Sequence, residues 1–187
     1  MRRRFDIRIR TGTHTMKPIM KPSKQRGVAA VELALILPVM LILVFGITEL
    51  GRALYQYNGL VKATRGAVRY LSQYDLANED VTKVRNNTIK LAVFGAPLTC
   101  TDTKQLECTY PTTPLVTGLT EAQVRVYDYL NNTDHQGVLT GQGTVDLVTV
   151  RIGAPGTVFT FSPLISYVLP SDITFSPIQT TMASRYF

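Results

Sequence analysis

A run of mostly apolar residues near the N-terminus, Val28 to Ile47, contains a single charged side chain, Glu32. A helix of about 20 apolar residues is long enough to cross the hydrocarbon core of a bilayer. The run is apolar on all sides, which favours a membrane segment over a buried core helix with one apolar stripe. A carboxylate in such a segment costs about 2.5–3.5 kcal/mol at the bilayer centre and less near the interface. Glu32 therefore requires an explanation.

The positive charge of the chain is concentrated before this run. The formal net charge is +7, but residues 1–26 carry nine basic side chains and one acidic one, whereas the remainder carries 11 basic and 12 acidic side chains. A nucleic-acid partner for the folded part is therefore not expected. Basic residues before an apolar run favour a cytoplasmic N-terminus. Four cations follow the run and weaken that argument: Arg52, Lys62, Arg65 and Arg69.

The two cysteines support the same orientation. Cys100 and Cys108 both lie beyond the apolar run, eight positions apart. Such a pair fits a small disulfide loop in an oxidising compartment, with two free thiols as the alternative. A metal site would need two further ligands beside two thiolates, and His135 alone does not complete the set. We expect no metal and no cofactor.

Residue periodicity predicts an α+β fold, in which a long N-terminal helix packs on a small antiparallel sheet. The helix is expected from about Ala29 to about Ser72, and a second helix is expected to begin at an Asn78 cap. Alternation with period two predicts strands near 122–126 and 148–152 and a final edge strand near 180–187. The inner stripe of the long helix beyond the membrane is predicted from heptad-like spacing: Leu50, Leu54, Tyr57, Val61, Thr64, Val68 and Leu71.

No grouping of residues in the sequence indicates catalysis. The chain has no Gly-rich phosphate loop, no G-x-S-x-G, no C-x-x-C and no metal-spaced histidine pair. Asp128, Asp134 and Asp146 lie near His135 in the sequence, but aspartates in loops commonly form turns. We therefore expect that the protein is not an enzyme.

Gly27 and Glu32 together suggest proteolytic processing in front of the apolar run. A membrane-embedded protease could bind an extended segment at Gly27 and cut before Val28, so that the apolar helix is kept. This cut would remove the nine basic residues and create an amino group on Val28, about one helical turn from Glu32. Pairing of Glu32 with such an amino group on a neighbouring helix would offset its cost in the bilayer. The alternative is an interfacial acid in contact with water.

The segment Gly27–Pro38, which reads GVAAVELALILP, resembles the class III signal of type IV prepilins. With Phe45–Arg52 (FGITELGR) and Ala63–Tyr70 (ATRGAVRY), the chain resembles the TadE-like family, the minor pseudopilins of the Flp/Tad pilus. The resemblance covers about 45 residues in these segments. The ending Arg185-Tyr186-Phe187 lacks the acidic residue expected of a TadE-like chain, so TadE-like and TadF-like chains both remain open.

This resemblance implies a pilin-like fold and a role in pilus assembly, with adhesion and biofilm formation as its outcome. It implies a cytoplasmic leader at 1–27, which begins at Met1, Met16 or Met20 and is removed by a TadV-like prepilin peptidase. A transmembrane helix at 28–48 in the bacterial inner membrane and a periplasmic domain at 49–187 would follow. The implied partners are membrane lipid, the peptidase, TadF-like pseudopilins and the Flp major pilin. The alternatives are an uncleaved membrane anchor with a periplasmic binding domain and a pseudopilin of another type IV pilus or type II secretion system.

Overall fold

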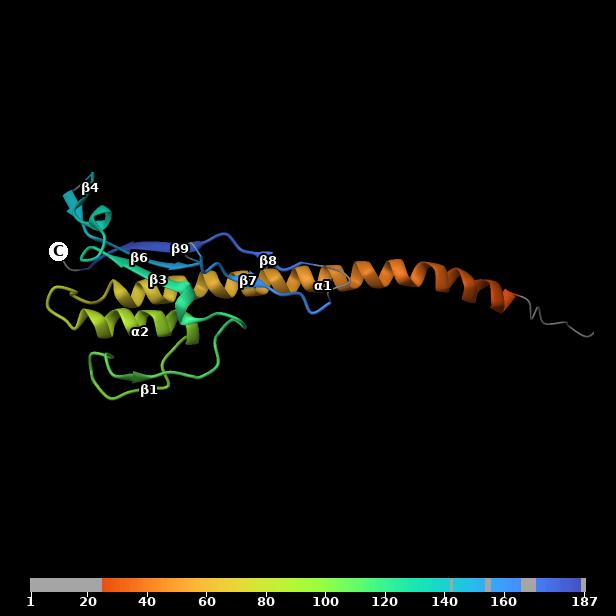
Figure 1. Cartoon of the computed structure of the whole chain (residues 1–187), viewed down its shortest axis with the longest axis horizontal. Helices are drawn as coiled ribbons and strands as arrows, with labels where there is room; N and C mark the ends of the chain where they lie inside the picture. The colour runs from red at the N-terminus through yellow and green to blue at the C-terminus, as the bar shows by residue number, and fades with distance from the viewer. Residues whose placement is uncertain (1–24, 142, 154–155, 166–170, 186–187) are drawn as a thin grey trace, which may run out of the picture. The chain divides into compact units, whose positions relative to one another are not determined.

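The structure, a computed structural model, describes residues 25–141, 143–153, 156–165 and 171–185, with side chains from residue 27 onward (Figure 1). The predicted leader up to residue 24, with the alternative starts Met16 and Met20, lies outside the described residues. The chain divides into two compact units, 1–41 and 42–187, which are described separately.

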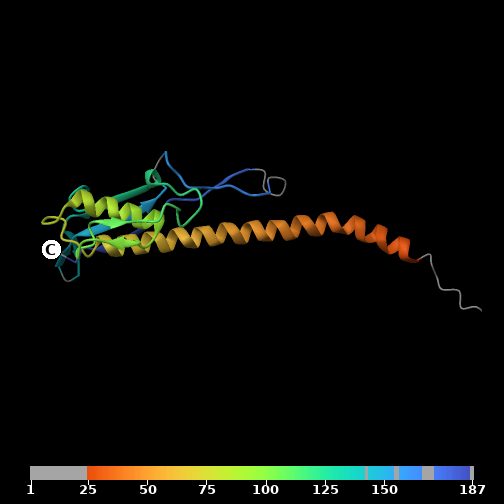
Figure 2. The same cartoon turned by 90° about the horizontal axis from the view of Figure 1, so that it is seen from below.

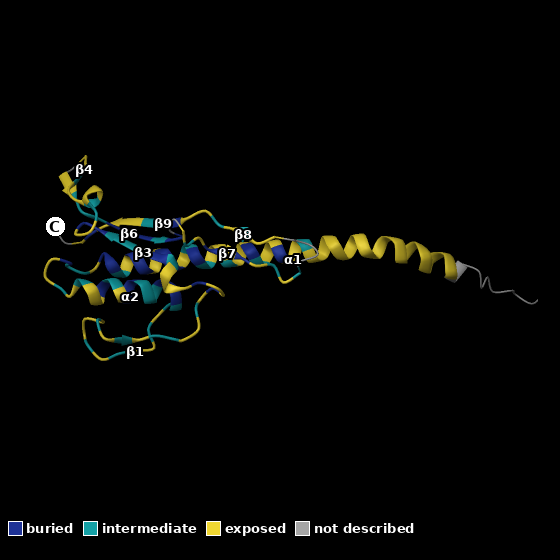
Figure 3. Cartoon of the chain, in the orientation of Figure 1, coloured by how far each residue is buried: buried dark blue, intermediate teal, exposed yellow. Residues whose placement is uncertain are grey.

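The described part of the first unit is the beginning of helix α1, Gln25–Leu71. The helix begins four residues before the predicted start at Ala29, and it contains Pro38. A proline inside a helix removes one backbone hydrogen bond, which membrane helices tolerate. All residues from 27 to 45 are exposed (Figure 3). Among the described residues, α1 is the one helix long and apolar enough to span a membrane.

In the second unit the end of α1 packs through a face of small and branched residues. Leu50, Leu54 and Tyr57, which the heptad spacing placed on the inner stripe, are instead 57%, 54% and 42% exposed, so that part of the prediction is wrong. Three alanines on the packing face provide a physical reason, because short side chains let the neighbouring backbone approach closely. The buried residues of this face are Ala53, Leu60, Ala63, Thr64, Ala67, Val68 and Leu71.

A three-stranded antiparallel sheet covers this face of α1, in the order β3-β6-β9. Its strands are β3 (Val124–Asp128), β6 (Leu147–Ile152) and the edge strand β9 (Ile178–Ala183). The hydroxyl groups of Thr64 on α1 and Thr180 on β9 are hydrogen-bonded at 3.0 Å, which places that strand against the helix. The long helix with small antiparallel sheets confirms the predicted α+β class.

Helix α2 (Val81–Phe94) returns beside the end of α1 and completes the core (Figure 1). Its N-cap is Asp80, whose side chain accepts a hydrogen bond from the backbone N–H of Lys83. The prediction that Asn78 is the N-cap is therefore wrong. The side-chain amide of Asn78 instead donates a hydrogen bond to Asp75 in the preceding turn. Helix α2 ends before Gly95, where the backbone adopts a φ of 80° that a glycine accepts without strain.

Three two-stranded hairpins complete the part of the fold that the structure describes. β1 (Thr99–Cys100) pairs with β2 (Cys108–Thr109), β4 (Val138–Thr140) with β5 (Gly143–Val145), and β7 (Thr160–Phe161) with β8 (Ile173–Thr174). The segment that carries β7 runs beside α1 (Figure 2). The hairpin β4–β5 lies between β3 and β6 in the chain. The short 3-10 helices are η1 (Glu121–Gln123) and η2 (Thr133–His135).

Candidate processing and assembly site on helix α1

The expected cleavage site, Gly27 and Val28, lies in the first turn of α1. No acidic residue stands in this turn to complement the positive end of the helix dipole, and the preceding residue is Arg26. The first four backbone N–H groups of a helix have no partner within it, so such a turn opens readily. A Cβ atom added at Gly27 would meet nothing within 4 Å. Nothing in the described fold therefore requires a glycine at this position.

Glu32 is exposed on an otherwise apolar part of α1. Its neighbours Val31 and Leu33 are 61% and 58% exposed. Within the described part of the chain, Glu32 forms no ion pair and no hydrogen bond through its side chain. If these side chains lie in lipid, a compensating group for the carboxylate has to come from another molecule or from residues outside the described part.

A second acidic residue of α1 has the opposite environment, because Glu49 is only 3% exposed. Its Oε1 accepts a hydrogen bond from the backbone N–H of Leu164 at 3.1 Å. Its Oε2 accepts two hydrogen bonds from Arg52, from Nε at 3.1 Å and from Nη2 at 2.9 Å. A carboxylate removed from water is stabilised only when its oxygens are satisfied in this way.

Arg52 extends this cluster onto the hairpin β7–β8. Its Nη2 also donates to the carbonyl oxygen of Ser162 at 2.6 Å, and its Cζ lies 4.2 Å from the centroid of the Phe161 ring. We call Glu49, Arg52, Phe161, Ser162 and Leu164 the helix clasp. It fixes α1 to the β7 segment close to the end of the apolar run.

The sequence interpretation missed the helix clasp. It counted Arg52 only among the cations that follow the apolar run and gave Glu49 no role. The available signal was an acid and an arginine at i and i+3, immediately after an uncharged run, which is the spacing of a helical ion pair. The partners 110 residues or more away could not be identified from local pattern.

An open groove of about 740 Å³ runs beside α1 in the second unit. Gly59, Ala63 and Gly66 contribute small residues to its wall, and Leu115 contributes an apolar one. A Cβ atom at Gly66 would meet nothing within 4 Å, so intramolecular packing does not explain this glycine. The groove therefore leaves this side of α1 open, and Leu50 and Leu54, which do not line it, are exposed elsewhere on the helix.

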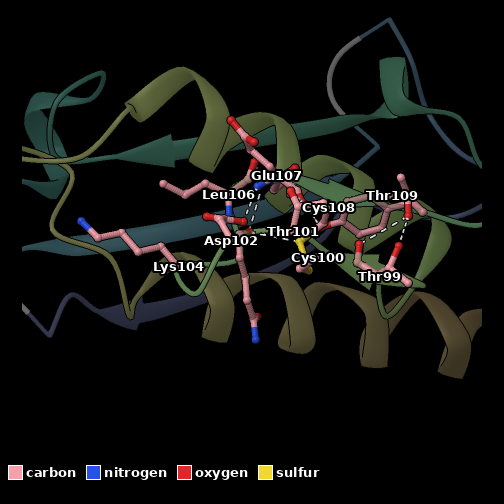
Figure 4. Close-up of a disulfide and its surroundings, with 12 residues drawn as sticks. Thr99, Cys100, Thr101, Asp102, Lys104, Leu106, Glu107, Cys108 and Thr109 are labelled. Carbon is pink, nitrogen blue, oxygen red and sulfur yellow. Dashed lines mark hydrogen bonds between the residues drawn. A yellow bond between two sulfur atoms is a disulfide. The ribbon is translucent and has the colours of Figure 1, made fainter.

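Cys100 and Cys108 form a disulfide with a Cα–Cα distance of 4.1 Å, as the sequence predicted (Figure 4). Inside the loop that they close, the Asp102 carboxylate accepts hydrogen bonds from the backbone N–H groups of Leu106 and Glu107, both at 2.8 Å. The Glu107 N–H, followed by that of Leu106, lowers the pKa of Asp102, because hydrogen bonds to a carboxylate favour its charged form.

The disulfide loop is attached to both helices. The Tyr70 hydroxyl of α1 donates to the Gln105 carbonyl oxygen at 2.9 Å, and the Asn87 amide of α2 donates to the Leu106 carbonyl oxygen at 2.9 Å. Tyr74 donates to the carbonyl oxygen of Lys104. Burial raises the pKa of Tyr74, which keeps its phenol protonated as a donor. These contacts identify the loop as a structural feature of the domain.

The aspartates that lie near His135 in sequence have separate structural roles. Asp128 is fully buried and accepts hydrogen bonds from Arg85 of α2, from Nε at 2.7 Å and Nη2 at 2.9 Å. Asp146 accepts from the Gly137 N–H at 2.8 Å, next to the hairpin β4–β5. Within the described ranges, no three His, Cys, Asp or Glu side chains are arranged to hold a metal ion.

Comparison with protein families gives one match in the N-terminal part of the chain. Residues 27–69 match the family model described as TadE-like protein. This confirms the resemblance drawn from the sequence, and the matched range begins at Gly27 and includes both Glu32 and Glu49. No curated protein and no solved structure matches the chain.

Proposed function

We propose that this chain, whose residues 27–69 match the TadE-like family, is a minor pseudopilin required for assembly of Flp/Tad-type pili. Residues 1–27 are its cytoplasmic leader, 28–48 its helix in the bacterial inner membrane, and 49–187 its periplasmic domain. A TadV-like prepilin peptidase removes the leader after Gly27. The protein then takes part with TadF-like pseudopilins and the Flp major pilin in building pili for adhesion and biofilm formation.

The observation that carries the proposal is the environment of Glu32. Its carboxylate is exposed among large apolar side chains and has no partner within the described part of the chain. A lone acid of this kind in a membrane helix costs free energy, so its presence there points to a function. The α-amino group of Val28, created by cleavage, supplies a positive charge at nearly the same depth on a neighbouring subunit. That pairing favours helices that assemble side by side in register.

The first turn of α1 supports cleavage at Gly27. The turn has no acidic residue, and its initial N–H groups have no helical partner, so the peptidase can open it at low cost. Glycine adds backbone freedom and leaves space beside the scissile bond. The empty space around Gly27 agrees with recognition by another protein, because packing within the chain does not use it.

The helix clasp and the groove support a role for the external domain in assembly. The clasp fixes the sheet domain to α1 just beyond the proposed membrane segment, so force on the helix is transmitted directly to the domain. Beyond the clasp, Leu54 and Tyr55 of α1 are 54% and 79% exposed. Tyr55 and the groove that it lines offer a largely apolar surface to the next subunit, and Leu54 offers an apolar contact on another side of the helix.

Processing is tested by N-terminal sequencing and mass spectrometry of the membrane form produced in a pilus-forming host. We expect a mature N-terminus at Val28. Gly27→Leu should leave the leader attached, because a branched side chain fills the space beside the scissile bond. Gly27→Ala is the matched control and should still be processed, at a reduced rate. An intact leader on the wild-type membrane form would instead indicate an uncleaved anchor with a binding domain.

Assembly is tested separately with Glu32→Ala and Glu32→Gln. Both variants should be cleaved at the normal position but give few or no pili, as counted by electron microscopy. Leu35→Ala, which truncates an exposed side chain on the same helix, is the control and should preserve piliation. Normal piliation by both Glu32 variants would contradict the pairing mechanism. Normal Flp pili in a strain without the protein would contradict the assembly role itself.

A further inference from the structure

The three-stranded sheet has an outer face, opposite the one that packs on α1 and α2. Side chains alternate between the faces of a strand, so residues in register on neighbouring strands form rows across the sheet. The inner face includes Asp128 and Thr180, which contact Arg85 of α2 and Thr64 of α1. Two rows of the outer face are set by the strand register: Arg125, Arg151 and Gln179, then Tyr127, Thr149 and Thr181.

The first row places two arginines directly opposite each other. Arg125 of β3 and Arg151 of β6 are register partners, and like charges in this arrangement destabilise a sheet. Among the described residues neither arginine has an ion pair. Arg125 donates through Nη1 to the backbone oxygen of Val124 at 3.2 Å. The Nε of Arg151 is buried and has no hydrogen-bond partner.

The second row is held rigidly by its own hydrogen bonds. The Thr149 hydroxyl is bonded to that of Thr181 at 2.7 Å and to Nε2 of His135 at 2.8 Å. The Tyr127 ring stacks on the His135 ring, with 6.4 Å between centroids. None of the large apolar side chains that are exposed in the described structure belongs to either row. The arginine pair therefore lies beside a fixed surface of hydroxyl and aromatic groups.

We propose that Arg125 and Arg151 bind a carboxylate, and that the ligand is an acidic polysaccharide built from uronate sugars. A carboxylate accepts two parallel hydrogen bonds from a guanidinium group, and it offsets the repulsion between the two cations. The exposed Gln179 and Thr181 provide hydrogen-bonding groups for the sugar hydroxyls beside the carboxylate. A polypeptide partner would usually bury large apolar side chains at the centre of its interface, and none of the exposed large apolar side chains of the described structure lies in these two rows.

Calorimetry with the full-length protein in detergent micelles tests this proposal. The probe is an oligogalacturonate, and the comparison ligand is the same oligomer with its carboxylates methyl-esterified. We expect saturable binding of the acid and binding at least about tenfold weaker for the ester, because the charge-assisted hydrogen bonds are lost. Equal binding of acid and ester, or no binding of the acid, would overturn the proposal.

Variants and a peptide ligand identify the site and the ligand class. Arg125→Gln and Arg151→Gln should each weaken oligogalacturonate binding about tenfold. Arg65→Gln, which changes an exposed arginine of α1, should leave it unchanged. Because Arg125 is exposed, its variant tests the site even if Arg151→Gln disturbs the sheet. Without ligand, Arg125→Gln should raise the unfolding temperature, since it removes the repulsion. Polyglutamate binding as tightly as the sugar acid would overturn the assignment to a polysaccharide, and unchanged binding by Arg125→Gln would overturn the site.

Discussion

The buried carboxylate of Glu49 accepts a hydrogen bond from the backbone N–H of Leu164 at 3.1 Å, across a separation of 115 residues. A helix residue thereby holds a segment that lies far along the chain, with Arg52 as its second partner. Within the helix clasp, loss of the Glu49 carboxylate should reduce the stability of the fold most, because this group is almost completely removed from water.

Truncation of Glu49 is expected to destabilise the folded domain that follows the apolar run. Glu49→Ala leaves the Leu164 N–H and the Arg52 guanidinium without their acceptor, at a cost of about 3 kcal/mol. Glu49→Gln keeps an oxygen for the Leu164 N–H and should cost less. Denaturant unfolding of the full-length protein in detergent, followed by tyrosine circular dichroism, measures both. Glu121→Gln, an exposed acid, is the control, and a Glu49→Ala variant as stable as that control would contradict the role of the helix clasp.

The pair formed by Arg85 and Asp128 should couple α2 to the sheet. Asp128 is fully buried, and the Arg85 side chain is 30% exposed. The hydrogen bond to Asp128 raises the pKa of Arg85, so the guanidinium group keeps its positive charge. We expect Asp128→Asn to cost about 3 kcal/mol, because it leaves a guanidinium without its counter-charge. A double-mutant cycle with Arg85→Met should give a coupling of about 2 kcal/mol, and additive effects of the two changes would contradict direct pairing.

Acid is expected to loosen the disulfide loop. The pKa of Asp102 is lowered in the folded loop, so its contribution is present above the ordinary aspartate pKa of about 3.9 and is lost as pH falls through the folded value. Reduction of the Cys100–Cys108 bond by a phosphine, which acts in acid, should therefore accelerate below about pH 4. Asp102→Asn should be reduced rapidly at every pH. Asp134→Asn, which changes an exposed aspartate of η2, is the control and should be reduced at the wild-type rate at each pH. A reduction rate of Asp102→Asn that depends on pH as the wild-type rate does would contradict the prediction.

Two glycines of α1 provide a matched test of packing against helix propensity. A Cβ at Gly66 meets open space, so Gly66→Ala should stabilise the helix by about 1 kcal/mol. A Cβ at Gly59 would lie 3.0 Å from Cγ2 of Val116, so Gly59→Ala should lose that gain or destabilise the domain. Thermal unfolding measures both variants. Equal stabilisation by the two changes would contradict the tight contact between α1 and Val116. If the groove binds another subunit, Gly66→Ala should also reduce piliation while the protein becomes more stable.

Local pattern predicted the helices and the strands of the main sheet, because these depend on composition and period. The apolar run required a helix, and alternation around Val124 and Val150 indicated strands that the structure confirms. The side of α1 that packs against the sheet was not predictable in the same way. Heptad spacing predicted that Leu50 and Leu54 are buried. The sheet instead packs on alanines, whose small side chains contribute little to a hydrophobic pattern. Tertiary packing therefore overrode the strongest local pattern.

The candidate site was predictable only where its chemistry is local. Glu32 stands out as the single charge in the apolar run, and two cysteines allow only one pairing within the chain. Glu49, by contrast, has a distant partner, the backbone N–H of Leu164. Every residue except proline has such a group, so the sequence does not indicate which one binds Glu49. The role of Asp128 was also hidden, since its partner Arg85 belongs to a different helix.

The hydrogen bond between Thr64 and Thr180 joins a helix made early in synthesis to the last strand of the described chain, 116 residues later. The part of the α1 face around Thr64 that β9 covers therefore stays uncovered until β9 has been made. If the N-terminus stays in the cytoplasm while the rest of the chain crosses the inner membrane, the domain cannot finish folding until almost all of it has been exported. During that interval α1 would expose the same alanine-rich face to any neighbour. A dedicated partner that shields this face would set the order in which export, folding and incorporation take place.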